Sequence, residues 1–342
     1  MLWIRMTPTF LVRPLALLLA AAASAQEPLL TEPLNVSRVV DGDTIYVMRA
    51  GKQEKLRLLS VDTEEKITGR APMSPTKPET VYGQESANWA KEFFAKLERD
   101  GKPPQVRLLF PSSKEESDIY GRLLCHVILM DGRDFNLLLV EEGRSPYFNK
   151  YGNSRLKHEA FVAAQAEAKR KQLGVWNPQT NMPKTAGAPA AKRPYGRLLP
   201  WWQARADAIE TFRALEARGT AIGADQPDEL QKSHEDKPDT EVTVFGEIYR
   251  LHNESDGTLT AQFRSADKQR TLRATIPSTS KKEIEGLLRG STEEFRQNFV
   301  FVEGLLERGP RGLHIVTPYA DQWRLAGPEP KTFVEAAAHN HK

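Results

Sequence analysis

The chain has 342 residues, with 48 lysines and arginines against 45 aspartates and glutamates, so its formal net charge is only +3. This length suggests more than one domain, and the composition, 39% hydrophobic and 27% charged, is typical of a soluble globular protein. The net charge is too small to indicate nucleic-acid binding, so any such function must come from local clusters. A single cysteine, Cys125, excludes an intrachain disulfide, and its apolar surroundings predict a buried structural thiol.

Residues 1–25 have the pattern of a secretory signal peptide. Arg5 and Arg13 precede an apolar stretch, Leu15–Ala23, and Ala23-Ser24-Ala25 supplies the small residues of a cleavage site before Gln26. An uncleaved membrane anchor is the alternative, but the apolar stretch is too short to span a bilayer. We therefore expect an exported protein, periplasmic or secreted, with no membrane span after signal cleavage.

Two acidic residues, Asp43 and Asp62, bracket a predicted β-hairpin. Its strands, Asp43–Arg49 and Glu54–Val61, follow a first strand at 34–40. Antiparallel pairing brings Asp43 beside Asp62, with Arg57 between them. Clustered carboxylates need a compensating cation, and oxygen ligands suit a hard cation such as Ca²⁺.

Two nearby groups add to this chemistry. The planar fork of Arg57 matches two phosphate oxygens, and Glu65 could accept a proton from water as a general base. The alternative for the Asp-Gly-Asp motif alone is a solvated hairpin, since Asp-Gly is also an ordinary turn sequence.

The rest of the first half alternates helices and strands. An apolar stripe of period three to four predicts a helix at Tyr82–Arg99, after an exposed loop at Lys66–Glu79. Further elements are strands at 105–110 and 123–130 and helices at 135–142 and 154–172, the last capped by Ser154. Five strands and three helices in this order predict an OB-type barrel carrying helices, an α+β fold that is mainly β.

A second arginine, Arg122, lies in the turn sequence DIYGR at 118–122. This motif occurs with DGDT at 41–44, RLLSVDTEE at 57–65, YGQE at 82–85 and LGVW at 173–176. In this combination and order, the chain resembles the staphylococcal-nuclease-like (thermonuclease) family over residues 33–176. We take residues 26–176 as this domain.

The resemblance implies a Ca²⁺-dependent endonuclease that hydrolyses phosphodiester bonds of single-stranded or denatured DNA and RNA, leaving 3′-phosphates. By position, it implies two groups of site residues: Ca²⁺ ligands at Asp43, Asp62 and the backbone carbonyl of Thr63, and catalytic residues Arg57, Glu65 and Arg122. Separately, Tyr120 and Tyr151 are candidates for substrate contacts, holding the terminal phosphate or stacking on a base. The alternative for both tyrosines is an exposed aromatic that supports a loop.

Two positions depart from the family pattern. Glu64 stands where the family usually has proline, which allows a looser turn at Glu65 and leaves Glu64 as a competing base. Ile119 stands where a lysine is common, which removes one cationic contact to the substrate.

A proline- and alanine-rich basic linker at 177–197 is expected to be solvated, or else to follow a phosphate backbone. The segment 198–240 combines an amphipathic helix, Trp201–Arg218, with a polar linker at 219–239 that we expect to be flexible. The helix could dock on either neighbouring domain.

Residues 241–325 predict a second small β-barrel, with strands at 241–252, 258–265, 270–276, 299–307 and 312–318. A helix at 281–288 between the third and fourth strands favours an OB-like barrel, with an SH3-like barrel as the alternative. Its partner is unknown; Arg250, Arg264, Arg270 and Arg273 could line a nucleic-acid groove, whereas Phe263, Phe299 and Phe301 are expected in the core. Residues 326–342 are expected to form a flexible tail.

A function of a different class stays open. The chain could be a catalytically weak or inactive nuclease-like module that binds nucleic acid or an envelope protein partner. All of the polar positions of the site are filled, however, and an inert domain has no physical reason to keep them converging.

Overall fold

The computed structural model describes residues 27–69, 76–118, 120–182, 191–265, 267–288, 299–309 and 312–326. The predicted signal peptide lies outside these residues, as do Ile119, the middle of the 177–197 linker and nearly all of the predicted tail. Within the described ranges, no helix is both long enough and apolar enough to cross a membrane.

The first half of the chain forms a closed five-stranded barrel. Pairing runs from β2 through β3, β4, β6 and β5 back to β2, and only β4 and β6 are parallel neighbours. A short strand, β1 (Leu29–Leu30), extends the pairing along β5. The barrel strands are β2 (Leu34–Val39), β3 (Thr44–Arg49), β4 (Lys52–Leu58), β5 (Gln105–Phe110) and β6 (Leu123–Leu129).

Three helices accompany this barrel: α1 (Val81–Ala95), α2 (Phe135–Glu141) and α3 (His158–Arg170). The Thr80 hydroxyl caps α1 by accepting from the Gly83 amide, and Asp134 caps α2 in the same way. Ser154 was expected to cap α3, but this helix begins only at His158 because residues 155–157 form a turn. The barrel and its helices enclose one apolar core, with Leu56, Leu108 and Phe135 fully buried.

The second half forms a second closed barrel with the same strand order. Pairing runs from β8 through β9, β10, β12 and β11 back to β8, and β10 and β12 are parallel. A helix, α6 (Ser278–Leu288), again falls between the third and fourth strands, which confirms the predicted OB-like barrel. The strands are β8 (Glu241–Asn253), β9 (Leu259–Phe263), β10 (Arg273–Ile276), β11 (Phe299–Gly309) and β12 (Gly312–Val316), flanked by β7 (Ile222–Gly223) and β13 (Trp323–Leu325).

The segment 219–239, expected to be flexible, is ordered against the second barrel. It contains β7 and a helix, α5 (Pro227–Asp236), whose Leu230 is buried. His234 places its Nδ1 3.0 Å from the carbonyl oxygen of Leu306. The polar composition therefore reflects a surface helix that contributes only one buried apolar residue.

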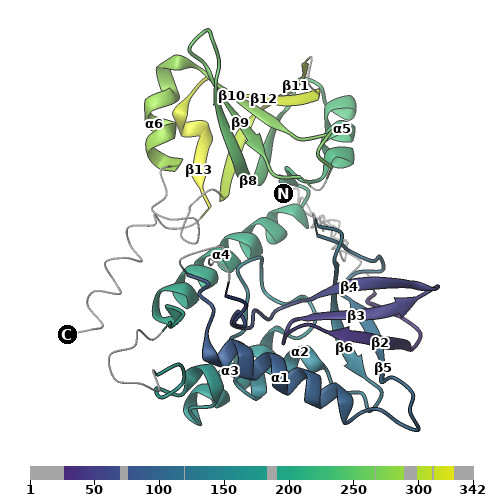
Figure 1. Ribbon diagram of the computed structural model, residues 1–342. Coiled ribbons are helices and arrows are strands. Elements are labelled where there is room, and N and C mark those ends of the chain that lie inside the picture. Colours follow the sequence, from purple (N-terminus) through teal and green to yellow (C-terminus); the bar gives the residue numbers. More distant parts are fainter. Residues whose placement is uncertain are drawn as a thin grey trace, which may run out of the picture.

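A long helix, α4 (Tyr195–Glu216), lies between the two barrels and begins six residues before the predicted Trp201 (Figure 1). Near its start, Leu198, Trp201 and Trp202 are fully buried and pack with Phe148 of the first barrel domain. Near its end, Phe212 packs with three phenylalanines of the second barrel: Phe245, Phe299 and Phe301. The prediction that Phe263, Phe299 and Phe301 are core residues is confirmed, since all three are buried. Phe263 lies in the barrel core, whereas Phe299 and Phe301 belong to a separate core cluster formed with Phe212 of α4.

Candidate active site

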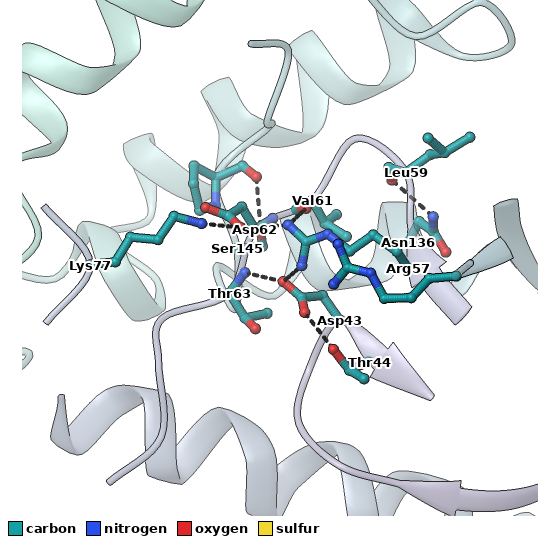
Figure 2. A network of polar contacts seen from close by, with 12 residues as sticks. Asp43, Thr44, Arg57, Leu59, Val61, Asp62, Thr63, Lys77, Asn136 and Ser145 are labelled. Carbon is teal, nitrogen blue, oxygen red and sulfur yellow. Dashed lines mark hydrogen bonds and ion pairs between the residues drawn. The ribbon is translucent and has the colours of Figure 1, made fainter. Parts of the chain in front are cut away.

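The β3–β4 hairpin brings Asp43 and Asp62 together, and Arg57 bridges them. Thr44, the first residue of β3, pairs with Arg57 near the end of β4. Asp43 immediately precedes β3 and Asp62 follows β4, so the two aspartates lie at the same end of the hairpin. Arg57 Nη1 lies 2.6 Å from Asp43 Oδ2, and Arg57 Nη2 lies 2.5 Å from Asp62 Oδ1. Figure 2 shows the guanidinium between the two carboxylates, with Lys77 pointing at Asp62.

Thr63 completes this arrangement through its backbone. Its amide donates to Asp43 Oδ2 over 2.9 Å. A Cβ on Gly42 would come within 2.5 Å of Thr63 Cγ2, so only glycine permits this close approach. The Asp-Gly-Asp motif is therefore packed against the end of β4, which argues against the solvated hairpin.

Asp62 is the most enclosed member of the cluster. Its side chain is 2% exposed, and its amide donates to Ser145 Oγ over 2.8 Å. Among the described residues, three cations contact the carboxylate: Arg57 and Lys77 at Oδ1, and Arg193 at Oδ2. Burial alone would raise the pKa of Asp62, but the charges of Arg193, Lys77 and Arg57 hold it well below its ordinary value.

Asp41 supplies an acidic oxygen near Asp43 and Glu65. Burial, and then the neighbouring charge of Asp43, raise the pKa of Asp41 to about 7. Among the described residues, its buried Oδ1 has no hydrogen-bond partner. An orphaned carboxylate oxygen beside two other carboxylates is the environment that a hard cation stabilises.

The described residues contain no group of three or more His, Cys, Asp or Glu side chains arranged to hold a metal ion. The protein nevertheless offers Asp43, Asp62 and the carbonyl of Thr63, with Asp41 nearby. Such an all-oxygen set fits Ca²⁺, which fills its remaining positions with water or substrate oxygens.

Comparison with known proteins identifies the family of this chain. The family described as "Staphylococcal nuclease homologue" matches residues 55–178. The thermonuclease of Staphylococcus intermedius is 35% identical over 143 residues, covering 41% of this chain and 74% of the relative. The thermonuclease of Staphylococcus hyicus is 34% identical over 144 residues, 42% of this chain and 74% of the relative. Endonuclease YncB of Bacillus subtilis is 32% identical over 144 residues, 42% of this chain and 61% of that protein. The chain belongs to the staphylococcal nuclease family.

Glu65, the general base that the family resemblance predicts, is exposed near the carboxylates. Partial burial raises the pKa of Glu65; Asp43 and Asp62 also raise it, while Lys77 opposes them. Its own carbonyl accepts from the Thr80 amide over 2.9 Å. The glutamate side chain is thus directed by a turn that is anchored through its backbone.

Glu64, which replaces the family's proline, has a different environment. It is buried, and its Oε2 accepts from the Thr80 hydroxyl over 2.5 Å and from Asn181 Nδ2 over 2.7 Å. A Cβ on Gly83 would lie 2.2 Å from the Glu65 carbonyl oxygen, so the start of α1 sits directly against this turn. These contacts fix the turn without proline and give Glu64 a structural role.

Arg122 lies immediately before β6, the strand that pairs with β4. Its Nε donates to Asp118 Oδ2 over 2.6 Å, and its guanidinium carbon lies 5.4 Å from the centre of the Tyr120 ring. No contact between Arg122 and the Asp43–Asp62 pair occurs in the described residues, so the structure does not join the second arginine to the carboxylates directly.

The two tyrosines are accessible. Tyr120 is 78% exposed beside Arg122, and Tyr151 is 63% exposed, with its ring centre 5.8 Å from that of Phe148. Either ring could stack on a base, and neither is held in an apolar core.

Arg193 is a site residue that the sequence did not reveal, and so is Lys77, which lies in a segment expected to be an exposed loop. Arg193 lies outside the family-matched residues 55–178, in a segment expected to be a solvated linker, and that expectation is wrong for this residue. Its side chain is 2% exposed and contacts Asp62. The available signal was the aromatic sequence that follows it, Tyr195 and then Trp201-Trp202, which is unusual for a flexible linker.

Proposed function

We propose that this protein is an exported, Ca²⁺-dependent nuclease that hydrolyses phosphodiester bonds of DNA and RNA. Thermonuclease and endonuclease relatives support a hydrolytic nuclease activity in general. The observation that carries the proposal is the convergence of Asp43 and Asp62, bridged by Arg57, with Glu65 beside them.

Asp43, Asp62 and the Thr63 carbonyl would hold the metal ion. Bound Ca²⁺ would neutralise the negative charge that develops on the phosphate. Glu65 accepts a proton from the attacking water, as the exposed carboxylate next to the cluster.

The two arginines stabilise the transition state. Arg57 gives up part of its contact with the carboxylates to donate to a phosphate oxygen. Arg122, whose Nε and Nη2 contact Asp118, donates to another phosphate oxygen. We propose cleavage on the 5′-oxygen side, leaving 3′-phosphates, as the family resemblance implies. The substrate is single-stranded or denatured nucleic acid, with Tyr120 and Tyr151 placed to stack on bases.

Export is the final element of the proposal. It is supported by the pattern of residues 1–25 and by the choice of Ca²⁺, which is plentiful outside cells and scarce in the cytosol. Recovery of the mature chain, beginning at Gln26, outside the cytoplasm would test it.

The deciding experiment is digestion of denatured DNA by purified residues 26–342, with Ca²⁺ and with a chelator, beside the Glu65→Gln variant. Cleavage that requires Ca²⁺ and collapses in the variant supports the proposal. Undiminished cleavage in chelator refutes the metal requirement. Binding without cleavage by the unmodified chain would instead identify a nuclease-like binding module.

A further inference from the structure

Arg193 reaches Asp62 from beyond the residues, 55–178, that the family model matches. The two residues are 131 positions apart. Arg193 Nη1 donates to the Asp62 carbonyl oxygen over 3.1 Å, while Nη2 bonds Asp62 Oδ2, and Nε donates to the Thr76 carbonyl oxygen over 3.3 Å. The guanidinium therefore binds both the backbone and the side chain of a candidate metal ligand.

The start of α4 fixes this guanidinium in place. Its carbon lies 5.4 Å from the ring centre of Trp202 and 5.7 Å from that of Tyr195. Trp202 packs edge-to-face on Phe148, at 4.8 Å between ring centres, and the Phe148 amide donates to the Ser60 carbonyl over 2.9 Å. Arg193 is thus anchored, through α4, to the loop that leads into Asp62.

Lys77 makes a different kind of contact with the same carboxylate. Its ammonium lies 3.1 Å from Asp62 Oδ1, and its side chain is 29% exposed, against 2% for Arg193. A partly exposed lysine can turn into solvent at modest cost, whereas a buried, stacked and multiply bonded arginine cannot.

We propose that Arg193 is a positioning residue of the nuclease site. It commits Asp62 Oδ2 and the Asp62 carbonyl, so a metal ion would be offered only Oδ1, the oxygen that Arg57 and Lys77 contact, and the partly exposed Lys77 is the contact that would give way. Arg193 thereby orients the carboxylate and, through its nearby positive charge, weakens metal binding. The inference rests on the metal-dependent function proposed above, and extends the active site to a segment outside the family domain.

The test separates charge from geometry in the full mature chain. Arg193→Gln removes both, whereas Arg193→Lys keeps the charge but loses the planar fork. Lys192→Gln is the matched control, since it makes the same charge change one residue away at an exposed position. Calorimetric titration with Ca²⁺, without substrate, measures affinity, and cleavage of denatured DNA at saturating Ca²⁺ measures kcat.

For Arg193→Gln we expect Ca²⁺ binding about tenfold tighter, because a positive charge near the ligand has gone. We expect its kcat to fall by about tenfold or more, because Asp62 is no longer oriented. In Arg193→Lys, kcat should fall as in the Gln variant, whereas the Ca²⁺ affinity should stay within about threefold of that of the unmodified chain. Lys192→Gln should change neither kcat nor the Ca²⁺ affinity.

A merely structural role would lower the melting temperature and leave both constants of the folded protein unchanged. That result, or weaker Ca²⁺ binding in Arg193→Gln, overturns the inference. If Arg193→Gln does not fold, the Lys variant decides, and an unchanged kcat refutes the role. If no chain cuts DNA, calorimetry alone decides, so failure of the nuclease function is distinguishable.

Discussion

The adjacent glutamates Glu64 and Glu65 offer a sharp separation of structure from catalysis. We predict that Glu64→Ala destabilises the protein while its folded fraction keeps most of its activity, and that Glu65→Gln has the opposite effect. The reasoning is that Glu64 is buried behind two hydrogen bonds, whereas Glu65 is exposed beside Asp43 and Asp62.

The expected cost of Glu64→Ala follows from its contacts. Hydrogen bonds to a charged group contribute about 1.5–3 kcal/mol each, and removing the carboxylate leaves the Thr80 hydroxyl and the Asn181 amide without their acceptor. Relief from burying a charge offsets part of this loss. We therefore expect a net cost of about 2–4 kcal/mol in the free energy of unfolding.

The Glu65→Gln change keeps the size of the side chain and removes only its capacity to accept a proton. A positioned general base contributes about 10²–10⁴-fold to rate, so kcat should fall within this range. Because Glu65 has an exposed side chain, the melting temperature should change little.

Both variants are measured by thermal unfolding and by kcat on denatured DNA at saturating Ca²⁺. Glu64→Gln serves as an intermediate control, since an amide can replace only part of the hydrogen bonding. Activity that survives Glu65→Gln but disappears in folded Glu64→Ala would refute the reasoning and assign the base to Glu64.

Three further variants test other parts of the structure. Arg122→Lys should lower kcat almost as much as Arg122→Ala, by about 2–4 kcal/mol of transition-state stabilisation, because an ammonium cannot reproduce the fork; near-normal turnover of the Lys variant contradicts this. For Asp134, burial would raise the pKa, but the bonds from His126 and Lys157 lower it, so its stabilising contribution is present above about pH 4 and is lost as pH falls through the lower folded-state pKa. The melting temperature of Asp134→Asn should accordingly lie below that of the unmodified chain at pH 7, and the difference should shrink as the pH falls below about 4. A difference that stays constant with pH would contradict the assignment. Phe212→Ala should lower the free energy of unfolding by about 3–5 kcal/mol, because it removes the ring stacked on Phe245 at 4.7 Å between ring centres. The second barrel should then unfold in a transition separate from that of the first. A single, unchanged transition would argue against docking of α4 on the second barrel.

The first barrel and most of its site could be predicted from the sequence because their determinants are local. Alternating apolar residues define the strands, and a short hairpin is enough to bring Asp43 to Asp62. Arg193 could not be predicted in this way, because its contact joins positions 131 residues apart through a segment rich in proline and alanine.

The phenylalanines of β11 illustrate a second limit. Phe299 to Val302 are all buried, with Val300 and Val302 in the barrel core and the two phenylalanines against α4. A strand whose two faces are both buried has a continuous apolar sequence. The sequence therefore shows that both faces are buried, but not which part of the protein packs on each face.

The distance along the chain between Asp62 and Arg193 also bears on the order of folding. Contacts between residues far apart in sequence form late, since a long loop must close before they contribute. The first barrel, complete by residue 129, can collapse before α4 has been synthesised. Seating of Arg193 on Asp62 would then be among the last events of maturation, and full catalytic competence would be acquired only after the nuclease barrel itself had folded.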